Sequence, residues 1–370
     1  MRGRLGASST TSIAFSSPFR ATERRWAERT PELLPSAATV KDSRYAETTC
    51  KNSKRKRSSQ VPRLVRVSLS DRVPFPKVWD NTMLADLSSC EQKVNIRFFH
   101  HIRPNVQNVN LHAGASFAKG VEAVRRAAYT PNSTVEPRAA GARALLTHYG
   151  DFDPGDNVKS ADRMLGALES YLTQYSPESD HIKPLILNGV PCVEFSFAHP
   201  IDVLHPEDGE PIILCGRFDA LGVLNNDPTA LFVVDEKTTK QLGPTWPKQW
   251  TLRSQFMQYT WGAKKYGHPV VGAIVRGLSI LKRDFGHAEA ICYFPDWMLD
   301  RWYEQVCLKL ERVKQSWAAN KFTFNFADAC SSYGGCDYRM LCESQTPEAF
   351  LNPYFKIEPW NPLRLKIGTE

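Results

Sequence analysis

The 370-residue sequence lacks several features that would define its class. No apolar run is long enough for a transmembrane helix, and no apolar segment near its start resembles a secretory signal. Cysteine occurs nine times, and an odd count in a chain of this length argues against a disulfide framework. We therefore expect a globular protein of a reducing, cytoplasmic compartment, with no membrane partner.

A basic excess is also missing from most of the chain, although the net charge of the whole is +8. Residues 1–70 contain 15 Lys and Arg against 5 Asp and Glu, so the remaining 300 residues contain 32 against 34. The first segment is rich in Ser, Thr, Arg and Pro without a helical or strand period, which predicts a disordered basic extension. A nucleic-acid groove elsewhere would need local clustering of basic side chains.

Two apolar runs within residues 212–239 flank a polar Asn-Asn-Asp-Pro segment, which predicts two strands joined by a turn. Each run contains one carboxylate, Asp219 or Asp235, and Lys237 shares a strand face with Asp235. Converging carboxylates repel each other unless a hard cation such as Mg²⁺ lies between them, and an ammonium can orient water or offset charge on a phosphate. The pattern favours metal-assisted phosphodiester hydrolysis; solvated charges at a strand end are the alternative.

The segment from Trp250 to Tyr266 follows these strands and has a helical period. Its apolar stripe consists of Leu252, Phe256, Tyr259, Ala263 and Tyr266. Gln255 and Tyr259 lie one turn apart and share a face. Gly-x-x-Asp, Asp-x-Lys-Thr and Gln-x-x-x-Tyr, in this order, resemble the RecB-like branch of the PD-(D/E)XK nuclease superfamily.

The resemblance covers about Val78 to Glu343 and implies an α/β fold. Its features would be a mixed central β-sheet flanked by helices, of restriction-endonuclease-like type, with a helical N-terminal part and a cysteine-rich C-terminal segment. We expect the nuclease domain at residues 71–350 and a tail at 351–370. Patterning predicts helices at residues 82–102, 111–129, 139–149, 160–175 and 296–320, and strands at 190–197, 270–281 and 287–294.

The resemblance also implies roles for the residues of its motifs. Asp219, Asp235 and the carbonyl of Glu236 would hold Mg²⁺ or Mn²⁺. Lys237 would position the attacking water, while Gln255 and Tyr259 would steady the lysine, the water or the DNA backbone. Sequence preference is not expected, because these groups address phosphate and metal rather than bases.

One position departs from the family pattern. Where RecB-like nucleases have Gly-x-x-x-His, this sequence has Gly114 to Ala118, so the expected metal-binding histidine is an alanine. Glu194, in the predicted strand 190–197, is the candidate ligand that would offset this loss. A strand glutamate facing solvent is the alternative.

A loop predicted at residues 240–249 combines basic and aromatic side chains. Lys240 and Lys248 could contact phosphates while Trp246 stacks on unpaired bases, which predicts a nucleic-acid-binding loop. The proline-rich composition equally allows a lid that packs its tryptophan on the domain. Both interpretations stay open at the level of sequence.

Three cysteines lie close together near the end of the domain, at positions 330, 336 and 342. Such a group is typical of metal ligands. The end of this motif resembles the iron–sulfur motif of RecB-like nucleases, although its first spacing, from Cys330 to Cys336, is longer. With Cys90 as the fourth ligand, Cys330, Cys336 and Cys342 would bind a [4Fe–4S] cluster that joins the two ends of the domain. Zinc on the same thiolates and reduced, metal-free cysteines are the alternatives.

These observations predict a metal-dependent DNA nuclease, with exonuclease action expected, in recombination, repair or phage DNA processing. Its substrate would be DNA ends or single strands, and a helicase or recombination protein would be its partner. A DNA-end-binding subunit with weak or no catalysis is the second hypothesis, suggested by Ala118. A hydrolase or binding protein for another substrate, with purely structural carboxylates, is the third.

Overall fold

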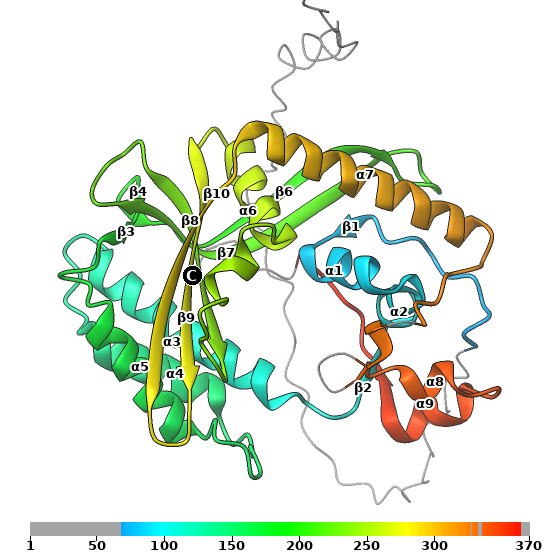
Figure 1. The fold of residues 1–370 in the computed structure, drawn as a ribbon, viewed down its shortest axis with the longest axis horizontal. Coiled ribbons are helices and arrows are strands. Elements are labelled where there is room, and N and C mark those ends of the chain that lie inside the picture. Colours follow the sequence, from blue (N-terminus) through cyan, green and yellow to red (C-terminus); the bar gives the residue numbers. More distant parts are fainter. Residues whose placement is uncertain (1–67, 327, 332–334, 364–370) are drawn as a thin grey trace, which may run out of the picture. The chain divides into compact units, whose positions relative to one another are not determined.

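The computed structural model describes residues 68–326, 328–331 and 335–363 (Figure 1). The chain divides after residue 63 into two units, and every described residue belongs to the second. Most of the predicted basic extension, and the end of the predicted tail after residue 363, lie outside the described residues. Of the helices in the described ranges, none is both long and apolar enough to cross a membrane.

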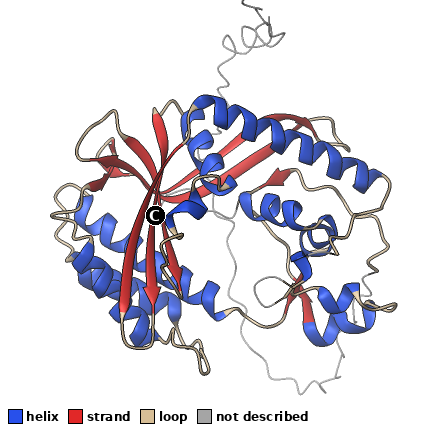
Figure 2. Ribbon diagram, in the orientation of Figure 1, coloured by secondary structure: helices blue, strands red, loops and turns tan. Residues whose placement is uncertain are grey.

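A central mixed sheet with helices on both faces forms this unit (Figure 2), which confirms the predicted fold class. The sheet contains β1 (Val78–Trp79), β3 (Ile182–Pro184), β6 (Val193–Leu204), β7 (Pro211–Leu224), β8 (Leu231–Thr239), β9 (Val270–Ile280) and β10 (Phe285–Tyr293). The larger helices are α1 (Asn81–Ser89), α3 (Val109–Tyr129), α4 (Pro137–Tyr149), α5 (Ala161–Gln174), α6 (Ser254–Lys265) and α7 (Asp296–Ala318).

The remaining elements are short, and several of them form the helical N-terminal part and the cysteine-rich C-terminal segment. The short helices are α2 (Glu91–Val94), the π-helix η3 (Asn95–Phe99), the 3₁₀ helices η4 (Pro247–Trp250) and η5 (Asp328–Cys330), α8 (Arg339–Cys342) and α9 (Glu348–Tyr354). Strands β2 (Ile102–Pro104) and β11 (Phe355–Ile357) pair with each other, as do β4 (Ile186–Leu187) and β5 (Val190–Pro191). The β2–β11 pair joins the two ends of the unit.

Strands β7 and β8 form an antiparallel hairpin that opens partway along its length. The paired residues of this hairpin run from Val223 opposite Leu231 to Ala220 opposite Val234. Beyond the pair of Ala220 and Val234, β7 continues beside β6 and β8 continues beside β9. Strands β8 and β9 are parallel, and helix α6 lies in the crossover that connects them. Figure 1 shows β6 and β7 running toward α7 while β8, β9 and β10 run past α3, α4 and α5. The two halves of the sheet therefore diverge immediately after Ala220 and Val234.

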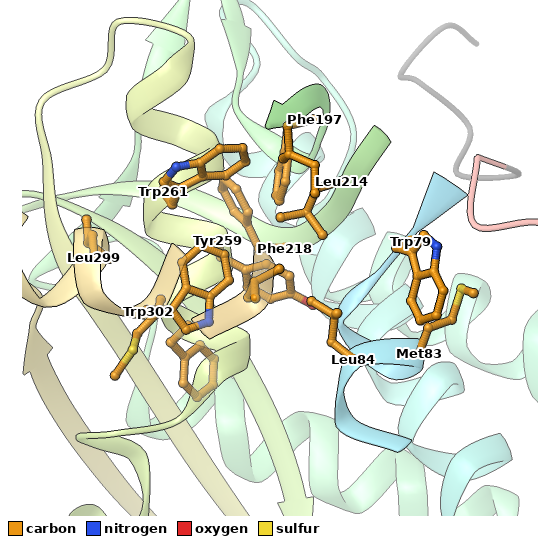
Figure 3. Packing of buried hydrophobic residues seen from close by; sticks show 14 of the residues in the cluster. Trp79, Met83, Leu84, Phe197, Leu214, Phe218, Tyr259, Trp261, Leu299 and Trp302 are labelled. Carbon is orange, nitrogen blue, oxygen red and sulfur yellow. The ribbon is translucent and has the colours of Figure 1, made fainter. Parts of the chain in front are cut away.

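Each face of the sheet is covered by its own set of helices. On one face α1, α6 and α7 bury a cluster rich in aromatic side chains, among them Phe197, Phe218, Tyr259 and Trp302 (Figure 3). On the other face α3, α4 and α5 pack on β9 through a second cluster that includes Phe117 and Leu278. The opening of the β7–β8 hairpin lies between these two cores, so both sets of helices position the side chains there.

The predicted helix at residues 250–266 starts too early. Residues 247–250 form a 3₁₀ turn instead, and α6 begins at Ser254. Leu252 and Tyr266, expected on the buried stripe, are 74% and 50% exposed. In the 3₁₀ turn, the centroid of the Trp250 ring lies 5.3 Å from that of the Trp246 ring. This aromatic contact interrupts the helical spacing of apolar residues before α6 begins.

The strand predicted at residues 190–197 is misplaced, because residues 190–191 pair with β4 as β5 and the long strand β6 runs from Val193 to Leu204. The remaining predicted elements agree closely with the structure. Helices α3, α4, α5 and α7 and strands β9 and β10 match their predicted ranges to within about two residues at each end, the usual uncertainty of element boundaries. The predicted helical segment at residues 82–102 is divided into α1, α2 and η3. Cys90 has an extended backbone conformation (φ −165°, ψ 122°) at the break between α1 and α2.

Candidate active site

Asp219 and Asp235 are the first residues beyond the last β7–β8 pair, where the hairpin opens. The Asp219 Oδ2 accepts a hydrogen bond of 2.9 Å from the backbone N–H of Glu236, which holds the Asp219 carboxylate against the freed edge of β8. The Asp235 carboxylate forms an ion pair with the Lys237 ammonium, two residues along the same strand. Strand alternation and strand divergence thus place two acids and one lysine together.

Burial and mutual repulsion govern the charge of these acids. Burial raises the pKa of Asp219 well above its ordinary value, and the neighbouring carboxylates of Asp235, Glu236 and Glu194 raise it further. Burial also raises the pKa of Asp235, against the opposing effect of Lys237. Burial alone would lower the pKa of Lys237, but the two aspartates raise it, so its ammonium stays charged. One lysine does not neutralise the whole group, which leaves it suited to a further cation.

Helix α6 supplies the Gln255–Tyr259 pair to the same place. The Gln255 Nε2 donates a hydrogen bond of 3.0 Å to the Tyr259 hydroxyl, one helical turn away, as their spacing predicts. Burial raises the pKa of Tyr259, and the charges of Asp235 and Asp219 act in the same direction, so the hydroxyl stays protonated. The ring centroid of Phe256, on the same helix, lies 5.8 Å from the Lys237 ammonium.

The Glu236 side chain contacts two helices in addition to its neighbours in the acidic group. The Arg125 Nη1 of α3 donates to its Oε2 at 3.0 Å, and the Tyr171 hydroxyl of α5 donates to its Oε1 at 2.9 Å. Burial would raise the pKa of Glu236, but Arg125 lowers it to about 2. Glu236 therefore meets Asp219 through its backbone, while its carboxylate anchors β8 to α3 and α5. Arg125 and Tyr171 were missed by the sequence analysis.

Glu194 lies opposite Asp219, between the β6–β7 pairs Val193–Ala220 and Phe195–Phe218. Its φ of 55° is in the left-handed region, which non-glycine residues occupy only when the surroundings enforce it. Its side chain is only 9% exposed, so the solvent-facing alternative is wrong. The carboxylate lies 2.9 Å from the Nε of Arg217 and 3.9 Å from the Nζ of Lys119.

Helix α3 has no histidine directed at this group. Ala118 stands at the expected position, and the next residue, Lys119, reaches the Glu194 carboxylate. His112, six residues earlier, contacts the Tyr149 carbonyl oxygen through its Nε2 at 3.0 Å, and its ring stacks on Phe152 with centroids 4.1 Å apart. His112 is therefore part of the packing between α3 and the end of α4.

The structure decides between the two interpretations of Trp246, which lies in the loop that follows β8. Trp246 is only 6% exposed, and its ring packs so tightly on β9 that a Cβ added at Gly277 would lie 2.4 Å from it. Its prediction as a base-stacking residue is therefore corrected: the tryptophan packs on the domain. Lys240 and Lys248 are exposed, so both remain able to meet a phosphate.

A metal ion at the divergence would have few side-chain ligands. Within the ranges that the structure describes, no three His, Cys, Asp or Glu side chains are grouped to hold a metal ion. Mg²⁺ commonly binds one or two carboxylates and completes its shell with water and substrate phosphate. Asp219 and Asp235 supply buried carboxyl oxygens, and a bound cation would favour their charged forms, which burial disfavours.

The four predicted cluster cysteines line one cavity of about 330 Å³, although they come from opposite ends of the unit. Cys90 follows α1, Cys330 ends η5, Cys336 precedes α8 and Cys342 ends it. Burial raises the pKa of Cys342 to about 11, and the three other thiols add to this shift.

Comparisons with known proteins leave the family open. No protein-family model matches the chain, and no curated protein does. A solved structure described as "Putative exonuclease" from Eubacterium rectale is 10% identical, covering 79% of this chain and 94% of its own, with a TM-score of 0.45. The structure of SSO0001 is 13% identical, covering 62% and 85%, with a TM-score of 0.27. At these TM-scores, neither similarity supports a functional conclusion.

Proposed function

We propose that this protein is a metal-dependent deoxyribonuclease that hydrolyses phosphodiester bonds, with exonuclease action in recombination, repair or phage DNA processing. The observation that carries the proposal is the meeting of Asp219 and Asp235 at the opening of the β7–β8 hairpin, with Lys237 paired to Asp235. A cytoplasmic location and a helicase or recombination partner belong to the same proposal.

Asp219, Asp235 and the carbonyl of Glu236 would hold Mg²⁺ or Mn²⁺, with Glu194 as a further candidate ligand. When bound, the metal would polarise the scissile phosphate. Lys237 forms an ion pair with Asp235, which places its ammonium beside the metal site as a hydrogen-bond donor. In that role it would orient the attacking water and offset negative charge that develops on the phosphate.

The Gln255–Tyr259 pair would act as support for Lys237 and the DNA backbone. The Tyr259 hydroxyl accepts from Gln255 and keeps its own proton, so it can donate one further hydrogen bond. A water molecule or a phosphate oxygen beside the aspartates would be its acceptor. Arg125 would act indirectly, because it holds Glu236 and thereby the backbone N–H that orients Asp219.

A cleavage assay tests the proposal. The full chain would be incubated with linear and circular DNA, single- and double-stranded, in EDTA, Mg²⁺ or Mn²⁺, beside Lys237→Met. Lys321→Met, a substitution at an exposed lysine, is the matched control. We expect metal-dependent cleavage that falls by about 10²–10³-fold in Lys237→Met, the usual loss for a group that stabilises transition-state charge. A preference for linear over circular DNA would identify exonuclease action.

A DNA-end-binding protein with weak or no catalysis is the second candidate, favoured by one observation. Ala118 offers no ligand where the resemblance places a histidine, and the neighbouring Lys119, which pairs with Glu122 at 2.6 Å, has its Nζ 3.9 Å from Glu194. Binding to DNA ends without cleavage at any metal concentration would support this candidate. A Lys237→Met variant as active as the wild type would refute the catalytic role of Lys237.

We also propose that Cys90, Cys330, Cys336 and Cys342 bind a [4Fe–4S] cluster with a structural role. The four thiols share one cavity, but no three of the described ones are grouped for a single metal ion. A four-iron cluster holds its thiolates farther apart than zinc does, because each thiolate binds a different iron. Zinc on the same four thiolates is the alternative. The cluster would fasten the α1–α2 break to the C-terminal segment.

Metal analysis of anaerobically purified protein tests this second site. We expect four irons per chain, the visible absorption of an iron–sulfur cluster, and loss of both in Cys342→Ser. Cys307→Ser is the matched control, because Cys307 is a partly buried free cysteine of α7 outside the cavity. One zinc per chain would identify the alternative metal, and no metal under anaerobic conditions would refute the proposal.

A further inference from the structure

Lys159 is a buried lysine beside the candidate active site that the proposed function leaves without a role. Its residue is 2% exposed, and it precedes Ser160, the N-cap of α5. The backbone holds it firmly: its carbonyl oxygen accepts from the Tyr149 hydroxyl at 2.7 Å, and its N–H donates to the Asn157 side chain at 3.1 Å. The position of this lysine is thus set by the fold.

The Lys159 ammonium has little to compensate its burial. Its Nζ donates to the Thr238 Oγ1 at 3.5 Å, the outer limit of a hydrogen bond. No carboxylate of the described residues forms an ion pair with it, and the charge that acts on it most is the Lys240 ammonium. Burial lowers its pKa, and Lys240 lowers it further. A buried cation beside a second cation is unfavourable unless an anion completes the site.

The surroundings of Lys159 connect it to the proposed reaction. Thr238 directly follows Lys237 on β8 and is half-buried, so part of this residue is accessible from the surface. A Cβ on Gly114 of α3 would lie 3.4 Å from the Thr238 hydroxyl, so α3 packs closely beside it. Lys240 and Lys282 line an adjoining cavity of about 340 Å³, together with the loop that leads into Lys159.

We propose that Lys159, Thr238 and Lys240 bind a second backbone phosphate of the DNA strand, next to the one that is cleaved. This inference rests on the proposed function and adds to it a position that holds the strand in register. Two ammonium groups and a hydroxyl match the oxygens of a phosphodiester, and a lysine binds phosphate as a point charge without reading bases. The site would thus bind DNA irrespective of sequence.

A purely structural lysine is the competing explanation, and it predicts a different effect on stability. If the weak hydrogen bond from Lys159 to Thr238 stabilised the fold, replacing Lys159 by methionine would destabilise the protein. If the lysine serves DNA binding, Lys159→Met removes a buried, unpaired charge with little change of shape. Stability should then stay the same or rise while DNA affinity falls.

The experiment measures binding of labelled single- and double-stranded oligonucleotides to the full chain by fluorescence anisotropy, with Ca²⁺ replacing Mg²⁺ to prevent cleavage. The salt concentration would be varied from about 50 to 200 mM for wild type, Lys159→Met, Lys159→Arg and the control Lys321→Met. One lost phosphate contact lowers the slope of log affinity against log salt by about 0.9 for duplex or 0.7 for single strands. At 0.1 M salt this corresponds to roughly five- to eightfold weaker binding.

Each outcome has a defined meaning. A reduced slope in Lys159→Met, an unchanged or higher unfolding midpoint, and recovery of the slope in Lys159→Arg would support the second phosphate site. Wild-type affinity and slope in Lys159→Met would overturn it and leave the nuclease proposal standing. A loss of both stability and binding in Lys159→Met and Lys159→Arg alike would assign Lys159 to the fold. Absence of DNA binding by the wild type would overturn both proposals.

Discussion

Replacing Arg125 by methionine should be among the most damaging changes to this fold, although the residue lies outside the proposed catalytic group. The Arg125 side chain is 10% exposed and the Glu236 side chain 2% exposed, and they form a bidentate ion pair between α3 and β8. Methionine fills similar volume but leaves the Glu236 carboxylate buried, with Tyr171 as its remaining side-chain donor. Removing one partner of a buried pair destabilises a protein by about 3–5 kcal/mol.

A double-mutant cycle separates the ion pair from lost packing. The free energy of unfolding in urea would be measured for Arg125→Met, Glu236→Gln and the double variant. We expect about 3–5 kcal/mol lost in Arg125→Met and a partial recovery in the double variant, because neither charge then remains alone. Nuclease activity should fall with stability in Arg125→Met, since Glu236 also donates the backbone hydrogen bond to Asp219.

Arg126→Met is the matched control on the same helix. The Arg126 side chain is 38% exposed, and its Nε lies 3.0 Å from the Glu122 Oε1 in a partly solvated i, i+4 pair. Such pairs contribute about 1 kcal/mol or less. An Arg125→Met variant that loses no more stability than Arg126→Met would refute the view that the buried pair holds β8 in place.

Three further substitutions test the packing around the site. Gly262→Ala should destabilise the protein by about 1–3 kcal/mol in thermal unfolding, because the added Cβ would lie 2.6 Å from the Phe197 ring. Gly243→Ala should change little, since a Cβ there meets no atom within 4 Å. Trp246→Ala should cost about 3–5 kcal/mol while leaving the DNA affinity of the folded protein unchanged. Weaker DNA binding at unchanged stability would instead restore the base-stacking role of Trp246.

Local spacing in the amino-acid sequence was sufficient to predict several features of the site. The two-residue period placed Asp235 and Lys237 on one strand face, and the four-residue period placed Gln255 beside Tyr259. Helix and strand periods located most elements, because a chain that must bury one face repeats its apolar residues at the period of its backbone. The boundary of α6 was missed because an aromatic contact between Trp246 and Trp250 replaces the helical period there.

Which distant residues share a site depends on how the helices and strands pack against one another. Arg125 meets Glu236 across 111 positions of the chain, and Lys159 meets Thr238 across 79. No local period encodes such pairs, because they depend on how α3 and α5 pack against the sheet. Packing on the opposite face of the sheet buried Trp246, and the pairing of β6 with β7 placed Glu194 opposite Asp219. Local pattern thus specifies the face on which a side chain lies, whereas packing between elements specifies what it meets.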